Sequence, residues 1–180
     1  MILNERNCRY EHVLNVGKQM MTAVRTAPKG KGADILETAL VTGEEIELLS
    51  ETLRILSGEN GLKFFLRDAD SVLYAECIVL IGTHEQEQGL NCGHCGYIAC
   101  NQRTQGVPCA INAIDVGIAI GSACATAADF RVDTRVMFSA GLAAQRLNWL
   151  PNCKMVMAIP VSASSKNPFF DRTPKEKIQK

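Results

Sequence analysis

The sequence predicts an α+β fold in a single domain, residues 1–180, in which helices flank a sheet. Two observations support this prediction. Apolar residues recur at helical spacing in several segments, and short apolar runs of strand length lie between those segments. Hydrophobic residues make up 47% of the chain, which is enough for a well-formed core at this length.

The first helix is expected over residues 4–25, because Val13, Val16, Met20 and Val24 lie three or four residues apart. Ala27-Pro28 ends it, since proline disfavours helical backbone at the residue before it. The next residues, 29–33, read KGKGA and predict a flexible basic loop. Residues 35–41 then predict a short strand.

A second helix is expected over residues 44–56, with Ile46, Leu49, Leu53 and Leu56 on one face. Ser57-Gly58 is the predicted end of this helix. Residues 77–82, CIVLIG, form a continuous apolar run and predict a buried strand.

A long helix is predicted from about Cys109 to Phe130, built almost wholly of small and aliphatic residues. Gly117 and Gly121 reduce its stability, so close packing or a nearby ligand is expected to compensate. We expect this helix to be central and mostly buried. The remaining elements are predicted in this order: a strand over 134–138, a helix over 140–148 and a strand over 154–161.

The composition argues against nucleic acid and membranes as partners. Nineteen basic and nineteen acidic residues give no formal net charge, and no basic stripe is present, so we expect no nucleic-acid partner. The apolar runs read as too short to cross a bilayer, so we expect no membrane partner. Eight cysteines without an apolar leader at the N-terminus predict a reducing, cytoplasmic location.

Four cysteines lie within eighteen residues: Cys92, Cys95, Cys100 and Cys109, spaced C-x2-C-x4-C-x8-C. Four soft thiolates in one loop favour a 4Fe-4S cluster. Gly93 lies where a tight loop needs positive φ or close backbone approach, as does Gly96. We therefore predict an inserted cluster-binding loop over residues 90–110. Asn91 and His94 are candidate hydrogen-bond donors around the cluster.

Two other interpretations of these cysteines remain open. Structural zinc also uses C-x2-C, although usually as two such pairs, and only one is present. Free or redox-active thiols are the other interpretation. The dispersed Cys77, Cys124 and Cys153 lie in apolar or small-residue runs and are expected in the core, with Cys124 a substitute ligand if Cys109 is not used.

The cysteine loop resembles the 4Fe-4S motif of iron–sulfur subunits of membrane electron-transport complexes and of corrinoid proteins. Most of the chain resembles a family of prokaryotic ferredoxin-domain proteins with no established reaction. The matching segments are RTAPKGKGAD, FFLRDADSV, LNCGHCGYIAC, IDVGIAIGSA and IPVSASSKNPFFDR, at residues 25–34, 64–72, 90–100, 114–123 and 159–172.

A more distant resemblance is to the FMN-dependent nitroreductases. Residues 24–28 (VRTAP) resemble their ARxAPS segment, and residues 115–119 (DVGIA) resemble their DAGIAAQN helix. Residues 159–160 and 172–174 resemble a strand ending in proline and a later R-x-P. The resemblance implies a sheet flanked by helices, a homodimer formed around the central helices, and FMN at the dimer interface.

The phosphate contacts that this resemblance implies are Arg25, Lys29, Lys31 and Arg172. The chain departs from the nitroreductase pattern, because the opening Arg-rich motif is absent and Lys29, Lys31 and Asp34 replace the usual flavin-holding residues. The sequence assigns no catalytic residue. It predicts an iron–sulfur redox protein, with electrons exchanged with a partner protein, a small acceptor or a flavin. The alternative is a non-catalytic module braced by zinc.

Overall fold

The computed structural model describes residues 1–171. Three long helices, two short helices, four strands and two 3-10 turns alternate along this part of the chain. In order they are α1 (Glu5–Thr26), η1 (Gly30–Gly32), β1 (Leu36–Val41), α2 (Glu44–Asn60), α3 (Phe64–Val72), β2 (Cys77–His84), η2 (Cys100–Gln102), α4 (Ala110–Asp129), β3 (Asp133–Thr134), α5 (Phe138–Arg146) and β4 (Cys153–Ser162).

The four strands form one antiparallel sheet in the order β1-β2-β4-β3. β2 is central, with Val79 opposite Leu40 of β1 and Ile159 of β4. Every residue of β2 except its last is buried, as the uninterrupted apolar run of 77–82 predicts. The predicted α+β class is therefore confirmed.

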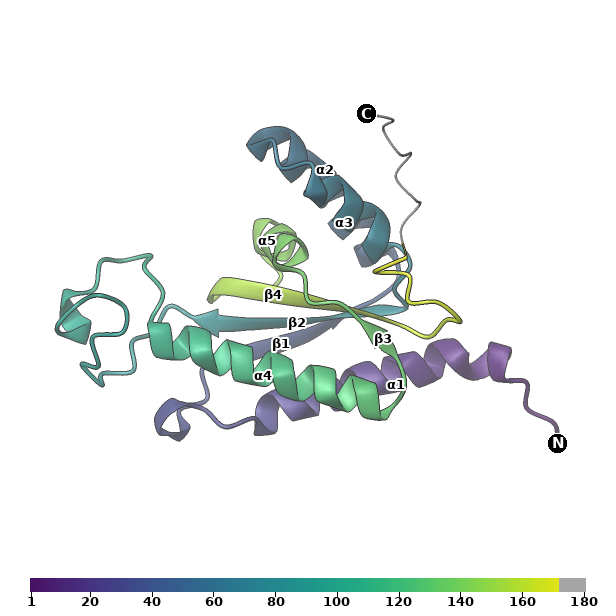
Figure 1. Ribbon diagram of the computed structural model, residues 1–180, viewed down its shortest axis with the longest axis horizontal. Coiled ribbons are helices and arrows are strands. Elements are labelled where there is room, and N and C mark those ends of the chain that lie inside the picture. The colour runs from purple at the N-terminus through teal and green to yellow at the C-terminus, as the bar shows by residue number, and fades with distance from the viewer. Residues whose placement is uncertain (172–180) are drawn as a thin grey trace, which may run out of the picture.

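The two faces of the sheet carry different helices (Figure 1). Side chains alternate along β2, so Ile78 and Leu80 pack with α2, α3 and α5, whereas Val79 and Ile81 pack with α1 and α4. A strand covered on both faces has no polar side, which is why β2 shows no alternation of polar and apolar residues. The result is two separate hydrophobic cores on one sheet.

The first helix follows its sequence pattern closely. The Asn4 side chain accepts a hydrogen bond from the backbone N–H of Arg6 and caps the N-terminus. Val13, Val16, Met20 and Val24 are buried, so the predicted apolar stripe is confirmed. The helix ends before Ala27-Pro28, also as predicted.

Other boundaries differ from the predictions. α2 continues through Ser57-Gly58 and ends at Gly61, whose left-handed conformation (φ 69°) provides the C-cap. α3 was not predicted at all. The predicted strand 134–138 is reduced to the two residues of β3, because α5 already begins at Phe138.

The long helix α4 has the predicted position but not the predicted burial. One face is buried, and it comprises Asn112, Asp115, Val116, Ala119, Ala123 and Ala127. A methyl group added at Gly117 or Gly121 would meet no heavy atom within 4 Å. The expectation that both glycines make close contacts is therefore wrong within one chain.

The expectation that every apolar run is too short to cross a bilayer is wrong for α4. By length and composition alone, its twenty residues meet the requirement for a membrane span. Length and composition are weak evidence, because a core helix of a water-soluble protein meets the same requirement. In this fold α4 packs along α1 and against β2, and its buried face includes the carboxylate of Asp115.

Candidate functional site

The predicted cysteine loop, residues 90–110, connects the end of β2 with the start of α4. Figure 1 shows it projecting beyond the end of the sheet, at the left of the view. Its one regular element is the short turn η2, which begins at Cys100. Cys109 is the residue immediately before the first turn of α4. The loop is thus a separate protrusion whose two ends are fixed by the core.

The four predicted ligands differ in exposure. Cys92 is exposed, Cys95 and Cys100 are half-buried, Cys109 is buried, and all four are free thiols. Among residues 1–171, no three His, Cys, Asp or Glu side chains are grouped closely enough to hold a metal ion. The four cysteines belong to one loop but do not converge on one point in it, and their role as ligands stays a prediction.

The backbone of the loop has features that suit thiolate ligands. Asn91, Gly93 and Gly96 have positive φ angles of 48°, 72° and 88°, as the sequence predicts for the two glycines. The backbone N–H of Asn91 donates a hydrogen bond to Cys100 Sγ at 3.3 Å. In return, Cys100 N–H donates to Asn91 Oδ1 at 2.8 Å. Such N–H groups stabilise negative charge on sulfur.

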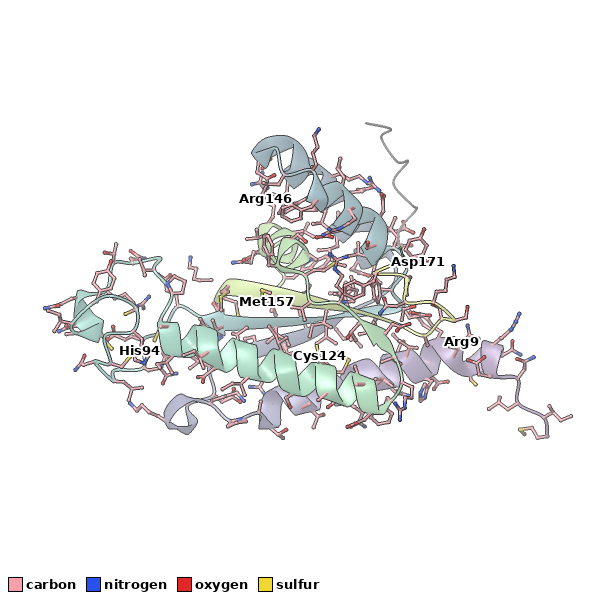
Figure 2. The ribbon with its side chains drawn as sticks, in the orientation of Figure 1. Arg9, His94, Cys124, Arg146, Met157 and Asp171 are labelled. Carbon is pink, nitrogen blue, oxygen red and sulfur yellow. The ribbon has the colours of Figure 1, made fainter. Side chains whose placement is uncertain are left out.

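His94, the other candidate donor, is exposed. Figure 2 places it in the cysteine loop beside the start of α4. Its role around a cluster stays a prediction, whereas the contact of Asn91 with Cys100 is present in the fold.

A buried polar group holds the base of the loop, and the sequence analysis missed it. Gln88 Nε2 donates to Asn112 Oδ1 at 3.0 Å, and both residues are buried. Asn112 Nδ2 donates in turn to the carbonyl oxygen of Gln86. A lone asparagine among the small and aliphatic residues of α4 was the available signal, because buried amides need partners.

The basic segment, residues 29–33, is anchored to the same helix. Gly30 N–H lies 3.0 Å from both carboxylate oxygens of Asp115. Lys31 Nζ donates to the carbonyl oxygen of Gln88 at 2.9 Å. The predicted flexible loop is therefore wrong: the segment forms the turn η1 and is tied to α4 and to the base of the cysteine loop.

Like Lys31, two more of the predicted phosphate contacts, Lys29 and Arg25, have partners within the chain. The ammonium of Lys29 donates to the carbonyl oxygens of Val24, Arg25 and Ala27, at 3.1, 2.7 and 2.8 Å. Its side chain is 4% exposed, so it satisfies carbonyl groups that the end of α1 leaves unpaired.

Arg25, the second of these contacts, pairs with Asp34 at 2.5 Å and is 47% exposed. Burial raises the pKa of Asp34, and the hydrogen bond and charge of Arg25 more than offset this, so the net pKa is lowered. Arg172 lies outside the described residues. The assignment of Arg25, Lys29, Lys31 and Arg172 to FMN stays a prediction.

The dispersed cysteines belong to the core, as predicted for Cys77 and Cys153. Burial raises the pKa of Cys77 to about 12 and that of Cys153 to about 11. Cys124 is half-buried, and Figure 2 shows it well along α4 from the cysteine loop. At the helical rise per residue it lies about 22 Å from Cys109, so it does not serve as a substitute ligand.

Comparison with known proteins relates the chain to one sequence family and one fold. A family described as "Uncharacterized protein containing a ferredoxin domain (DUF2148)" matches residues 105–172. This segment includes Cys109 but not the other three loop cysteines. An uncharacterized protein of Archaeoglobus fulgidus is 39% identical over 186 residues, covering 98% of this chain and 100% of that protein.

Solved structures share the fold. A nitroreductase with bound FMN from Desulfitobacterium hafniense superimposes with a TM-score of 0.59 at 16% identity, over 92% of this chain and 86% of that one. For a nitroreductase family protein from Clostridium novyi the TM-score is 0.58 at 16% identity, over 87% of this chain and 76% of that one. For a BluB-like flavoprotein from Clostridium difficile the TM-score is 0.56 at 14% identity, over 91% of this chain and 84% of that one. The nitroreductase-like fold is therefore confirmed.

Proposed function

The chain belongs to the family of uncharacterized proteins containing a ferredoxin domain (DUF2148), and on that basis we propose that it is an iron–sulfur redox protein that carries electrons. The ligands would be Cys92, Cys95, Cys100 and Cys109. A 4Fe-4S cluster held there would supply one-electron transfer. The chain itself supplies the thiolates, orients them and determines how far the loop is exposed to a partner.

The observation that carries the proposal is the contact of Asn91 with Cys100. The backbone N–H of Asn91 already points at one of the four sulfurs, and the Asn91 side chain fixes the Cys100 amide in return. A bond of this kind places the positive end of an N–H dipole beside the sulfur, as found around metal-bound thiolates. Cys100 is thus held in an environment suited to a metal-bound sulfur.

Exposure of the loop supports exchange of electrons with an external partner. Cys92 is exposed, and the nearby Ile98 is 86% exposed. A redox centre at such a place would lie close to the surface that a partner protein or small acceptor contacts. We propose a cytoplasmic location, because a chain with eight cysteines that serve metal binding or redox chemistry needs a reducing compartment.

Anaerobic purification tests the cluster. The wild-type protein should contain iron and acid-labile sulfide in equal amounts, and its visible absorbance should bleach with dithionite. Cys100→Ser should lose most of the bound iron, whereas Cys124→Ala, on α4 and outside the loop, should keep it. Stoichiometric zinc without sulfide would refute the proposal in favour of the zinc-braced module.

We propose further that FMN binds beside the basic segment; the structurally similar nitroreductase from Desulfitobacterium hafniense contains bound FMN. Arg25 is half-exposed and held in place by Asp34, so its guanidinium presents free donors on a fixed arm. Lys29 has three donors, and all three are used at the end of α1. Removing Lys29 should therefore lower folding stability as well as any phosphate contact.

Titration of FMN into the apo-protein tests this. Arg25→Ala and Arg172→Ala should each weaken binding about thirtyfold, the loss of one charge-assisted contact of about 2 kcal/mol. Arg146→Ala, on α5, is the control and should bind normally. Absence of binding by the wild type would discard the flavin and leave the cluster proposal standing.

We propose finally that the protein is a homodimer formed through α4. Five residues on its outward side are small or aliphatic and solvent-exposed: Ile114, Gly117, Ile118, Gly121 and Ala125. They recur at three- and four-residue spacing and form a stripe that one chain leaves uncovered. The two glycines would let the partner's helix approach closely.

Mass in solution tests the homodimer. Gly121→Leu should shift the protein toward monomer. Gly58→Leu is the matched control, because Gly58 also lies within a helix and a methyl group there would meet nothing within 4 Å. A monomeric wild type would refute the dimer.

A further inference from the structure

Arg103 is the one Lys, Arg, Asp or Glu residue between Glu87 and Asp115. This interval contains the whole cysteine loop. Four thiolates bound to a cluster leave a net negative charge in the loop, and the loop contains no other Lys or Arg side chain. Arg103 is therefore positioned in sequence to act on the electrostatics of the loop.

The contacts of Arg103 connect the two halves of the loop. Its backbone N–H donates to the carbonyl oxygen of Cys100 at 3.1 Å. Its guanidinium Nη1 donates to the carbonyl oxygen of Val107, two residues before Cys109. Arg103 thus contacts Cys100 through its backbone and the segment before Cys109 through its side chain.

The guanidinium also has an unused donor. Arg103 is half-buried, and its Nε is a buried atom with no hydrogen-bond partner among the described residues. An unpaired buried donor is costly, and more so when it belongs to a charged group. A negatively charged acceptor close to this nitrogen would remove that cost.

We propose that Arg103 is a positioning residue that closes the loop around the four cysteines and raises the reduction potential of the centre they hold. This rests on the proposed cluster. The added electron brings one more negative charge into the loop, and the fixed guanidinium stabilises that charge more than it stabilises the oxidised form. Residues 88–114 contain no second Lys or Arg, and the nearest cation with a printed contact, Lys31, bonds Gln88 at the base of the loop.

A redox titration of the anaerobically prepared protein tests the proposal, with dithionite as the electron donor and reduction followed by visible absorbance and electron paramagnetic resonance. At the wild-type midpoint, Arg103→Gln should lower the ratio of reduced to oxidised protein about tenfold, which is about 59 mV for a one-electron couple. Arg103→Lys keeps the charge and should stay close to wild type in potential while losing cluster faster in chelator, because one ammonium cannot replace the guanidinium bonds.

Arg146→Gln is the control for loss of a positive charge. Arg146 lies on α5, far from the cysteine loop in Figure 2, and pairs with Glu59. Its removal should leave the potential unchanged. An Arg103→Gln variant with the wild-type potential would overturn the inference and leave the proposed function intact.

The remaining outcomes are also decisive. If Arg103→Gln cannot retain a cluster but Arg103→Lys retains one at the wild-type potential, the charge is essential to the site, as proposed. If neither variant retains a cluster, the guanidinium acts in loop closure and the statement about potential is overturned. A wild type that never acquires a cluster would refute the proposed function, and this inference with it.

Discussion

The cysteine loop and the sheet use the same residue type in opposite ways. Cys92 is exposed and lies in a loop of left-handed turns, whereas Cys77 and Cys153 are buried at the ends of central strands. Around Cys77 the packing is close: a methyl group on Gly17 would lie 2.9 Å from its sulfur. Burial makes a cysteine an unreactive apolar residue, whereas an exposed cysteine is accessible to solvent and reagents.

The pKa values show the same contrast. Burial first, and then the charge of Glu76, raises the pKa of Cys77 to about 12. Burial first, and then Glu37, raises that of Cys153 to about 11. Both groups stay protonated at neutral pH, because the thiolate would lack solvation.

Alkylation kinetics should show the largest difference between the two regions. With apo-protein and iodoacetamide at pH 8, the exposed Cys92 should react at least about a thousandfold faster than Cys77, because the rise in the pKa of Cys77 from 9.0 to about 12 lowers its thiolate fraction by about that factor. Peptide mass spectrometry over time measures each site. Equal rates at Cys92 and Cys77 would contradict the contrast.

Alkaline pH should destabilise the fold through Cys77. Its folded pKa is raised from 9.0 to about 12, so the folded state binds more protons than the unfolded state between these values. Stability is therefore complete below pH 9 and falls as pH rises through this window, by about 1.4 kcal/mol per pH unit.

Urea denaturation at pH 9 and pH 11 measures the effect. Between these values the wild type should lose about 2–3 kcal/mol more unfolding free energy than Cys77→Ala. Cys8→Ala, on the exposed side of α1, should behave like the wild type. Identical pH slopes for the wild type and Cys77→Ala would show that burial does not hold this thiol protonated.

Enlarging a cysteine should affect the two regions unequally. Cys77→Leu forces extra methyl groups against Gly17 and the sheet, and should reduce the unfolding free energy by about 1–3 kcal/mol. Cys92→Leu in the apo-protein should change it by less than about 0.5 kcal/mol, because the site is exposed. Thermal and urea denaturation of both variants give the values, and a large loss at Cys92 would show that the loop is part of the core.

The smallest effect is expected at Asn91. Asn91→Ala removes the acceptor of the Cys100 amide, a bond of about 1 kcal/mol, and should speed hydrogen exchange of that amide about fivefold. Asn91→Asp keeps an acceptor oxygen and should preserve the slow exchange. Unchanged exchange in the alanine variant would mean that the bond does not form in solution.

Much of the fold followed from local patterns. The stripe of α1, the continuous apolar run of β2 and the small-residue helix α4 were each predicted within about two residues. Two elements were missed or cut short for physical reasons. α3 is only nine residues long. Its Asp68 is buried and accepts a hydrogen bond from Ser139 of α5, so a charged residue interrupts the apolar face that would have predicted a helix. β3 keeps two residues because α5 begins at Phe138, directly after Met137, which forms only an isolated bridge with Ala158 of β4.

The sequence by itself determined the α+β class, the two-sided burial of β2 and the concentration of four cysteines in one loop, because periodicity and spacing are local properties of the chain. The tertiary structure alone decided how distant polar groups pair. Lys31 meets Gln88 across 57 residues, and Gly30 meets Asp115 across 85. Each such pair forms because a buried polar group must find a partner, and which partner lies within reach depends on how α4 packs against α1.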